Sequence, residues 1–279
     1  MNALEIRDLT KSYGDFTLDH LNMTLPGGCI LGLVGENGAG KTTTIRLILN
    51  AIRRDAGTVT ILGKDNSQVE VKQDLGVVMD DAGLPGELNP TQIGKIMALT
   101  FRSWRQDVYE QHLTWMELPR KKAFRKFSKG MKMKLSLAIA LSHEAKLLIL
   151  DEPTSGLDPV ARDQIVEYIR QFVSDEDHAV VISSHIVSDL EKLCDYVAFL
   201  HRGKLLLWEE KDRLLEDYAM WHGSREALAE LPKEAVVFRK ENPYGAEAVV
   251  LREQLPNGTK LSPVGIEELF VAMIKEAKG

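Results

Sequence analysis

The residues with the clearest chemistry form a glycine-rich stretch near the N-terminus. Residues 35–42 are Gly-Glu-Asn-Gly-Ala-Gly-Lys-Thr, which fits the pattern G-x-x-x-x-G-K-[ST] without deviation. Glycines at these spacings let backbone N–H groups converge on phosphate oxygens, at the positive end of the helix that follows. Lys41 is expected to reach the β- and γ-phosphates of a nucleotide, and the Thr42 hydroxyl to bind Mg²⁺. The sequence therefore predicts a nucleotide-binding site.

A pair of carboxylates follows a second apolar run and supplies the other half of this chemistry. Residues 147–150 are Leu-Leu-Ile-Leu, and Asp151 and Glu152 come directly after them. Asp151 is expected to hold Mg²⁺ through its water shell, and Glu152 to polarise the attacking water. Alone, such a run is more often a strand that meets a solvated loop. Beside a phosphate loop, the catalytic interpretation is the better one.

The elements that must position these residues alternate between strand and helix. Apolar runs predict strands at 29–34, 57–62, 75–79, 146–150, 179–183 and 196–200, and helical spacing predicts helices at 41–52, 160–173 and 186–194. Residues 1–34 are β-rich, and the pattern over 84–142 is helical. This alternation predicts a mainly parallel sheet covered by helices.

The pattern changes after about residue 217. Residues 235–239 and 246–251 predict two strands around the turn Asn-Pro-Tyr-Gly at 242–245. Apolar residues at helical spacing over 266–274 predict a final helix, with acidic residues in its first turn and lysines in its last. We therefore expect a domain at 1–217 and a small α/β unit at 218–279.

Composition limits the class of protein. The 279 residues carry 35 Lys and Arg against 41 Asp and Glu, a net charge of −6, which argues against a surface built for nucleic acid. Two cysteines suggest a reducing compartment, and the N-terminus lacks the blocks of a signal peptide. The most apolar window, 135–150, is interrupted by polar residues. We expect a soluble, cytoplasmic chain that cannot itself carry a substrate across a membrane.

Further motifs give the chain a resemblance to the ATP-binding subunit of an ABC transporter over nearly its whole length. Residues 127–131, Phe-Ser-Lys-Gly-Met, occupy the place of the family's signature, which usually reads LSGGQ. Ser128 is expected to be the N-cap of the helix that runs to Leu141, so this is a second anion-binding helix start. Residues 155–158 (Ser-Gly-Leu-Asp) look like the D-loop, and His185 looks like the switch histidine that senses the γ-phosphate. Tyr13 is similar to the aromatic residue on which adenine stacks.

The resemblance implies a P-loop NTPase fold: a RecA-like, mainly parallel sheet, an antiparallel β subdomain, a helical signature subdomain and the small C-terminal appendage. It implies catalytic roles for Glu152 and His185, with ATP and Mg²⁺ as cofactors. The residues implied for nucleotide contact are Tyr13, Gly35, Asn37, Gly38, Gly40, Lys41, Thr42, Thr43, Asp80, Ser128, Gly130 and Asp158. Those implied for the metal are Thr42, Asp151 and Asp80.

Two motifs depart from the family pattern. The Q-loop position holds Asp80, or Asp81 if the register is off by one, where the family usually has Gln. An ionised Asp cannot donate a hydrogen bond to water, although it can hold Mg²⁺ through one. In the signature, Lys129 replaces a glycine and Met131 the glutamine. Lys129 either adds positive charge near a partner's γ-phosphate or faces solvent.

Two further groups of residues have open interpretations. Residues 120–134 contain eight basic side chains and no acidic one, which suits either a patch that binds nucleic acid or anionic lipid, or a solvated helical face beside an ATP-binding loop. The net charge favours the solvated face. Four aromatic residues are expected mainly in the core: Phe101, Trp104, Tyr109 and Trp115. In the family, a groove near the Asp80 loop receives a coupling helix, and one or two of these aromatics would line it.

The function that the resemblance implies is an ATPase that powers export through a separately encoded, multi-span permease. Two copies, or one copy and a sibling, would sandwich two ATP molecules at the cytoplasmic face of the membrane. Residues 128–131, 155–162 and 262–273 resemble the ABC-2 branch, which exports antibiotics, peptides or lipid-linked polymers. The alternative is a soluble ABC ATPase without a transporter, such as one in Fe–S cluster assembly. Co-purification with a polytopic membrane protein distinguishes the two.

Overall fold

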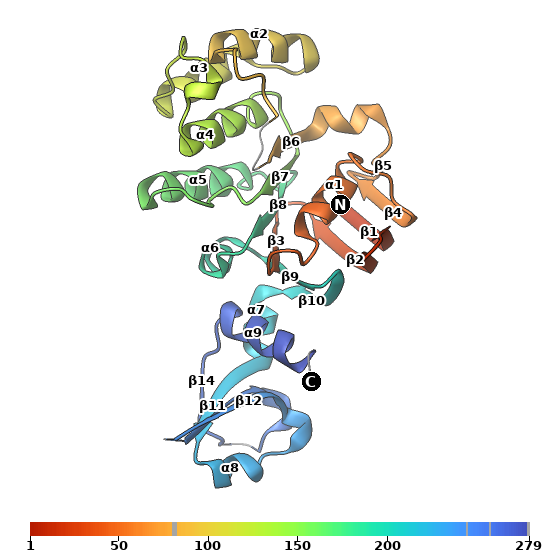
Figure 1. The fold of residues 1–279 in the computed structure, drawn as a ribbon, viewed down its shortest axis with the longest axis vertical. Helices are drawn as coiled ribbons and strands as arrows, with labels where there is room; N and C mark the ends of the chain where they lie inside the picture. The colour runs from red at the N-terminus through yellow and green to blue at the C-terminus, as the bar shows by residue number, and fades with distance from the viewer. Residues whose placement is uncertain (80–82, 244, 257, 278–279) are drawn as a thin grey trace.

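The central element of the molecule is a six-stranded sheet with the order β10-β9-β3-β8-β7-β6 (Figure 1). The computed structural model describes residues 1–79, 83–243, 245–256 and 258–277. The strands are β3 (Ile30–Gly35), β6 (Leu75–Val78), β7 (Leu147–Asp151), β8 (Ala179–Ser184), β9 (Tyr196–His201) and β10 (Lys204–Glu210). All run parallel except β10, which pairs antiparallel with β9. The predicted parallel sheet is confirmed.

Alternate residues of the central strands face two separate hydrophobic cores. In β3, Leu31 and Leu33 join the core beneath helix α1 (Lys41–Ile48), while Ile30 and Val34 join the core on the opposite face. Both faces are covered, so the strands are continuous apolar runs rather than alternating ones. Helix α1 ends at Ile48 and not at residue 52 as predicted, because Asn50 adopts a left-handed conformation with φ of 51°.

An antiparallel sheet covers the α1 side of the molecule. Its strands have the order β2-β1-β4-β5 and are β1 (Asn2–Tyr13), β2 (Phe16–Pro26), β4 (Ala56–Ile61) and β5 (Lys64–Asp65). A 3-10 helix, η1 (Val69–Asp74), connects this sheet to β6. The predicted β-rich N-terminus and the strand near 57–62 are confirmed.

The helical region between β6 and β7 lies at one end of the long axis in Figure 1. It contains α2 (Pro90–Thr100), α3 (Gln106–Trp115), the 3-10 turn η2 (Phe124–Lys126) and α4 (Lys129–Ala140). Tyr109 is fully buried, and its hydroxyl donates to the Pro90 carbonyl at 3.0 Å. Burial raises the pKa of Tyr109, so the hydroxyl stays protonated and remains a donor. Trp115 is 55% exposed and therefore departs from the predicted core position.

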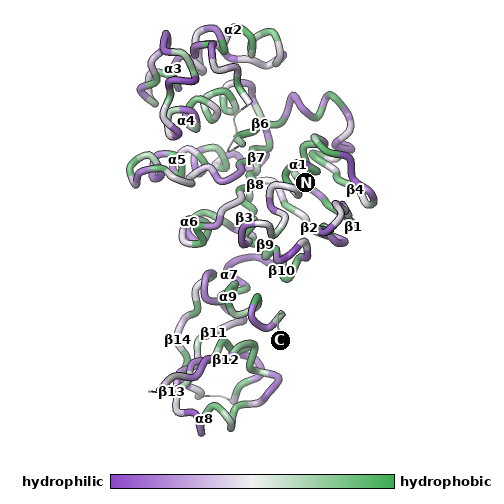
Figure 2. The backbone as a smooth tube through the Cα atoms, in the orientation of Figure 1, coloured by the Kyte–Doolittle hydropathy of each residue, from purple (hydrophilic) through white to green (hydrophobic). Residues whose placement is uncertain are grey.

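The opposite face of the central sheet carries α5 (Pro159–Phe172) and α6 (Val187–Leu193). Figure 2 shows hydrophobic and hydrophilic residues alternating along α5, as expected for a helix with one buried face. Ile165 and Ile169 lie on that buried face, four residues apart. In the described part of the chain, no helix is both long and apolar enough to cross a bilayer.

The C-terminal part forms a second antiparallel sheet at the other end of the long axis (Figure 1). Its order is β12-β13-β11-β14, and its elements are α7 (Lys211–Asp217), β11 (Tyr218–Gly223), α8 (Arg225–Ala229), η3 (Lys233–Ala235), β12 (Val236–Asn242), β13 (Gly245–Leu251), η4 (Arg252–Gln254), β14 (Leu261–Ser262) and α9 (Ile266–Glu276). The two predicted strands and the final helix are confirmed; β10, α7 and β11 were not predicted. The division at residue 217 stays a prediction.

Helix α9 packs back against the central sheet. The Phe270 ring meets Phe199 of β9 edge-on, with centroids 5.2 Å apart. The Ile266 N–H donates to Glu191 Oε1 of α6 at 3.3 Å, so a side chain of α6 satisfies the first turn of α9. The two parts of the chain therefore share one hydrophobic core.

Candidate nucleotide site

The glycine-rich loop connects the carboxyl end of β3 to the N-terminus of α1. Gly38 and Gly40 have φ of 81° and 113°, a conformation that L side chains rarely adopt. The loop forms one side of a cavity of about 590 Å³. The cavity is lined by Phe16, residues 36–43, Glu152, Ser155 and His185. The phosphate loop therefore faces the same cavity as Glu152 and His185, which come from distant parts of the chain.

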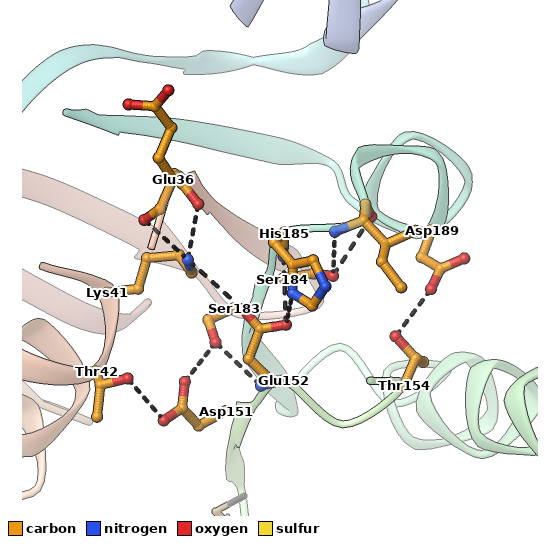
Figure 3. A network of polar contacts seen from close by, with 12 residues as sticks. Glu36, Lys41, Thr42, Asp151, Glu152, Thr154, Ser183, Ser184, His185 and Asp189 are labelled. Atoms are coloured by element: carbon orange, nitrogen blue, oxygen red, sulfur yellow. Dashed lines mark hydrogen bonds and ion pairs between the residues drawn. The ribbon is translucent and has the colours of Figure 1, made fainter. Parts of the chain in front are cut away.

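The Lys41 ammonium is buried at the centre of the loop. Its Nζ donates to the Gly35 carbonyl at 2.7 Å and to the Glu36 carbonyl at 3.4 Å. It also lies 3.5 Å from Glu152 Oε1 (Figure 3). Since the Lys41 side chain is only 7% exposed, these contacts replace water around its charge.

Asp151 lies at the end of β7, directly beside the first turn of α1. Its Oδ2 accepts a hydrogen bond from Thr42 Oγ1 at 3.0 Å, and its Oδ1 accepts one from Ser183 Oγ at 2.6 Å. The Ser183 hydroxyl in turn accepts from the Glu152 N–H at 3.1 Å. Adjacent parallel strands end at the same edge, and the fold thereby brings together oxygens of the type that Mg²⁺ prefers.

Glu152 and His185 contact each other across the ends of β7 and β8 (Figure 3). His185 Nδ1 lies 2.6 Å from Glu152 Oε2, and the His185 N–H donates to the same oxygen at 3.3 Å. Glu152 has a φ of 52°, a left-handed conformation that is uncommon for this residue type. The carboxylate is held from two sides, by Lys41 at one oxygen and by His185 at the other.

The D-loop segment packs within its own chain. The Asp158 side chain accepts from the Ala161 N–H at 3.0 Å and so caps α5. Thr154 Oγ1 donates to the buried Asp189 of α6 at 2.8 Å. Helix α6, which follows His185, is therefore tied to the strand end that carries Glu152.

Several expected site residues lie apart from this cavity. Ser128 caps α4 by accepting from the Met131 N–H at 3.3 Å, and neither Ser128 nor Gly130 lines the cavity. Tyr13 is 44% exposed and also does not line it, with Lys11 Nζ 5.2 Å from the centre of its ring. Asp80 and its neighbour Asp81 lie outside the described residues.

The structure adds two residues that the sequence did not single out, Phe16 and Ser183, and a cavity contact for Ser155 of the expected D-loop. Phe16 begins β2, across the hairpin from Tyr13, and its ring would lie 3.1 Å from a Cβ built on Gly40. Ser155 lines the cavity, and Ser183 bridges the two carboxylate residues. Ser183 had a signal in the sequence, as a hydroxyl two residues before the expected switch histidine. Phe16 had none.

A second cavity, of about 600 Å³, lies between β6 and helices α2 and α4. We call it the β6–α2 groove; Val77, Met97, Phe101 and His143 are among its lining residues. The Phe101 and His143 rings stack with centroids 3.9 Å apart. Ile96 and Leu99 on α2 are 44% and 91% exposed. Of the four aromatics expected mainly in the core, Phe101 thus lines a groove.

Part of the basic run at 120–134 is neutralised within the chain. Arg120 pairs with Glu110 at 2.8 Å, and Arg125 pairs with Glu87 at 2.6 Å. Lys132 lies over the Phe124 ring, 5.4 Å from its centroid. These contacts favour a solvated face over a nucleic-acid surface.

A parallel sheet with a phosphate loop after one strand and carboxylates after another defines a P-loop nucleoside triphosphatase. Comparison with known proteins gives the family. Residues 18–155 match the model of the ABC transporter family. The bacitracin transport ATP-binding protein of Bacillus licheniformis is 37% identical over 210 residues, 73% of this chain and 68% of that protein.

Two more similarities agree with this match. The lantibiotic transport ATP-binding protein of Streptococcus pyogenes is 35% identical over 212 residues, 75% of this chain and 91% of that protein. A solved ATP-binding subunit of an ABC transporter superposes with a TM-score of 0.69 at 26% identity, covering 77% of this chain and 92% of that one. The chain therefore belongs to the ABC transporter family. It is an ATP-binding subunit that hydrolyses ATP, and the predicted P-loop fold is confirmed.

Proposed function

We propose that the 590 Å³ cavity is where this subunit binds and hydrolyses ATP. The observation that carries the proposal is the convergence of Lys41, Glu152 and His185, from three separate elements, on one wall of that cavity. In this role the loop N–H groups and Lys41 hold the β- and γ-phosphates. Lys41 then exchanges its contact with Glu152 for a phosphate oxygen, which frees the carboxylate.

The residues beside α1 fit Mg²⁺. The Thr42 hydroxyl and the Asp151 carboxylate are both oxygen donors, and they lie 3.0 Å apart. Mg²⁺ is commonly held by one or two such groups together with substrate phosphates and water. When bound, the ion neutralises charge on the phosphates. Asp80, implied for the metal by the family resemblance, stays a proposal without structural support because it lies outside the described residues.

Glu152 is the proposed general base. Its carboxylate lies at the cavity wall and is 17% exposed, so it is accessible to an attacking water and still fixed in orientation. His185 holds the carboxylate through Nδ1 and, with half of its side chain exposed, can reach the γ-phosphate. The pair thus links the water to the terminal phosphate.

The remaining nucleotide contacts are proposed for residues of the phosphate loop and of the β1–β2 hairpin. Tyr13 is the proposed adenine-stacking residue, and Phe16 a second aromatic wall nearer the phosphate loop. Asn37 and Thr43 line the cavity with the loop glycines. These groups place the base end of the nucleotide towards the β1–β2 hairpin.

Ser128, Gly130 and Asp158 do not line the cavity of their own subunit. We propose that they complete the site of a second subunit, in a head-to-tail dimer that sandwiches two ATP molecules. The N-terminus of the twelve-residue α4 supports this, because Ser128 is exposed there and helix N-termini favour phosphate. The partner is a second copy or a sibling chain.

The β6–α2 groove is the proposed contact with a multi-span permease. Val69, which lines the groove, and Ile96 and Leu99 on the adjoining helix α2 are exposed apolar side chains that suit a helix of a partner protein. This arrangement would hold the subunit at the cytoplasmic face of the membrane, bound through the permease. Relatives that serve bacitracin and lantibiotic transport support an exporter of antimicrobial peptides, drug-like or lipid-type molecules.

The proposal is tested by expressing the chain with a multi-span membrane protein encoded beside its gene. We expect the subunit to sediment with membranes only when that protein is present, and to be released when it is absent. A subunit that stays in the soluble fraction with the intact partner present would favour the soluble ABC ATPase alternative.

A further inference from the structure

The turn between β9 and β10 contacts the phosphate loop through a backbone hydrogen bond. The Gly203 N–H donates to the Ala39 carbonyl at 2.9 Å, and the Gly203 carbonyl accepts from the Asp19 N–H at 2.8 Å. Gly203 has a φ of 80°, and a Cβ built there would lie 1.8 Å from the Thr17 carbonyl oxygen. Only glycine fits this position, so the turn links β2 to the far end of the phosphate loop.

His201, two residues earlier, faces the near end of the same loop. Its side chain is 7% exposed, and Nδ1 lies 3.3 Å from Glu36 Oε2. Nδ1 is buried, and no residue of the described chain gives it a hydrogen bond of good geometry. A buried polar atom without a partner is costly, so the Glu36 carboxylate is the group available to satisfy it.

Glu36 connects this contact to the lysine of the loop. The Glu36 carbonyl accepts from the Ala39 N–H at 3.0 Å and from Lys41 Nζ at 3.4 Å. The Glu36 side chain is 53% exposed and lines the nucleotide cavity, and within the described part of the chain His201 is the one residue that makes an ion-pair contact with it. Fixing the side chain of Glu36 therefore also fixes the carbonyl that orients Lys41.

We propose that His201 is a positioning residue for the phosphate loop, which it holds through Glu36 in the conformation that receives ATP. The ring acts on nucleotide binding and not on the chemical step, because it contacts neither Glu152 nor His185. The inference rests on the proposal that this loop receives the phosphates. It assigns the β9–β10 turn a role in the reaction, with Gly203 at one end of the loop and His201 at the other.

The test compares KM for ATP and kcat in the full-length protein. We expect His201→Leu to raise KM about tenfold and to leave kcat within about twofold, as for the loss of an interaction that is equally strong in the ground state and the transition state. His201→Asn places an amide donor near the position of Nδ1 and should restore KM. Glu36→Ala should reproduce the effect of His201→Leu, and the double variant should be no worse than either single one.

A matched control is His178, which stacks on Phe172 with centroids 4.4 Å apart and lies 2.9 Å, through Nδ1, from the Phe172 carbonyl. His178→Leu should leave KM unchanged. Unchanged KM in His201→Leu, failure of Asn to restore it, or additive effects with Glu36→Ala would each overturn the inference. If His201→Leu does not fold, Glu36→Ala carries the test, because its side chain is exposed.

Lys41→Ala separates this inference from the proposed site. Loss of ATP binding in Lys41→Ala with a normal KM in His201→Leu overturns only the role of His201. Normal ATP binding in Lys41→Ala overturns the proposed site itself.

Discussion

Glu152 is restrained at both carboxylate oxygens, by Lys41 at 3.5 Å and by His185 at 2.6 Å. Its backbone is also in a left-handed conformation, with φ of 52°. Such strain persists where the surrounding contacts over-determine it, and it is concentrated at functional sites. The strand end that carries Glu152 is held by Ser183, whose hydroxyl contacts both its N–H and Asp151. These restraints orient one carboxylate towards the cavity.

Replacing this carboxylate tests its role as the base. Glu152→Gln should lower the rate of phosphate release about 100-fold or more, because the amide cannot take a proton from water. ATP should still bind, and a nucleotide-bound dimer should accumulate on size-exclusion chromatography. Glu216→Gln, at an exposed position on α7, is the control. Unchanged turnover in Glu152→Gln would remove this residue from the reaction.

Asp158 caps α5 and is also proposed to act across the dimer, and two substitutions separate these roles. Asp158→Ala should lower the free energy of unfolding by about 1 kcal/mol, because the cap of α5 is lost. Asp158→Asn keeps a capping oxygen and should unfold like the wild type. We expect its hydrolysis rate to be about threefold lower or more, since the carboxylate charge is proposed to act across the dimer. Full activity in Asp158→Asn would exclude a role for the Asp158 charge across the dimer and would leave helix capping as its role.

The β6–α2 groove is a surface that several secondary-structure elements form together. Strand β6 is at the edge of the central sheet, and α2 exposes Ile96 and Leu99 beside it. The groove is also where α4 meets β6: Ile139 and Ala140 of α4 line it together with Leu75 and Val77 of β6. A partner in this groove would contact both elements at once.

A charge at the rim of the groove tests this contact. Leu99→Glu should leave the basal ATPase activity of the isolated subunit within about twofold, since this side chain is 91% exposed. It should abolish the part of the activity that a co-purified permease stimulates in vesicles, because a carboxylate would be buried without a partner. Val271→Glu on α9, far from the groove, is the control. Retained stimulation in Leu99→Glu would place the permease elsewhere.

At the scale of the whole molecule, the C-terminal part is joined to the ATPase core by packing. Phe270 and Leu269 of α9 belong to the same hydrophobic core as Phe199 and Leu190. Helix α6, which begins two residues after His185, supports the first turn of α9 through Glu191. The C-terminal sheet is therefore attached, through α9, to the helix that follows His185.

This packing predicts cooperative unfolding. Phe270→Ala should lower the free energy of unfolding by about 3–5 kcal/mol, because a ring that is 7% exposed leaves a cavity. Val271→Ala, next to it on the outer side of α9, should cost far less. Calorimetry should record one transition for the whole chain. Two separate transitions, with only the smaller one shifted by Phe270→Ala, would show that the C-terminal part folds independently.

The sequence by itself determined the fold class and the chemistry of the nucleotide site. The reason is local: a phosphate loop needs its residues in consecutive positions, and buried parallel strands need continuous apolar runs, so both are visible along the chain. Residues 35–42 and 147–152 met these conditions. The same local logic predicted the Ser128 cap of α4.

Only the tertiary structure decided which distant residues meet. It brought Phe16 to the phosphate loop, placed the Ser183 hydroxyl between Asp151 and the Glu152 N–H, packed α9 against α6, and set His201 opposite Glu36. Contacts of this kind depend on strand order and on which distant elements pack together, and neither leaves a periodic pattern in the sequence. The motifs specified which groups are present, and the packing of the sheet specified what each of them touches.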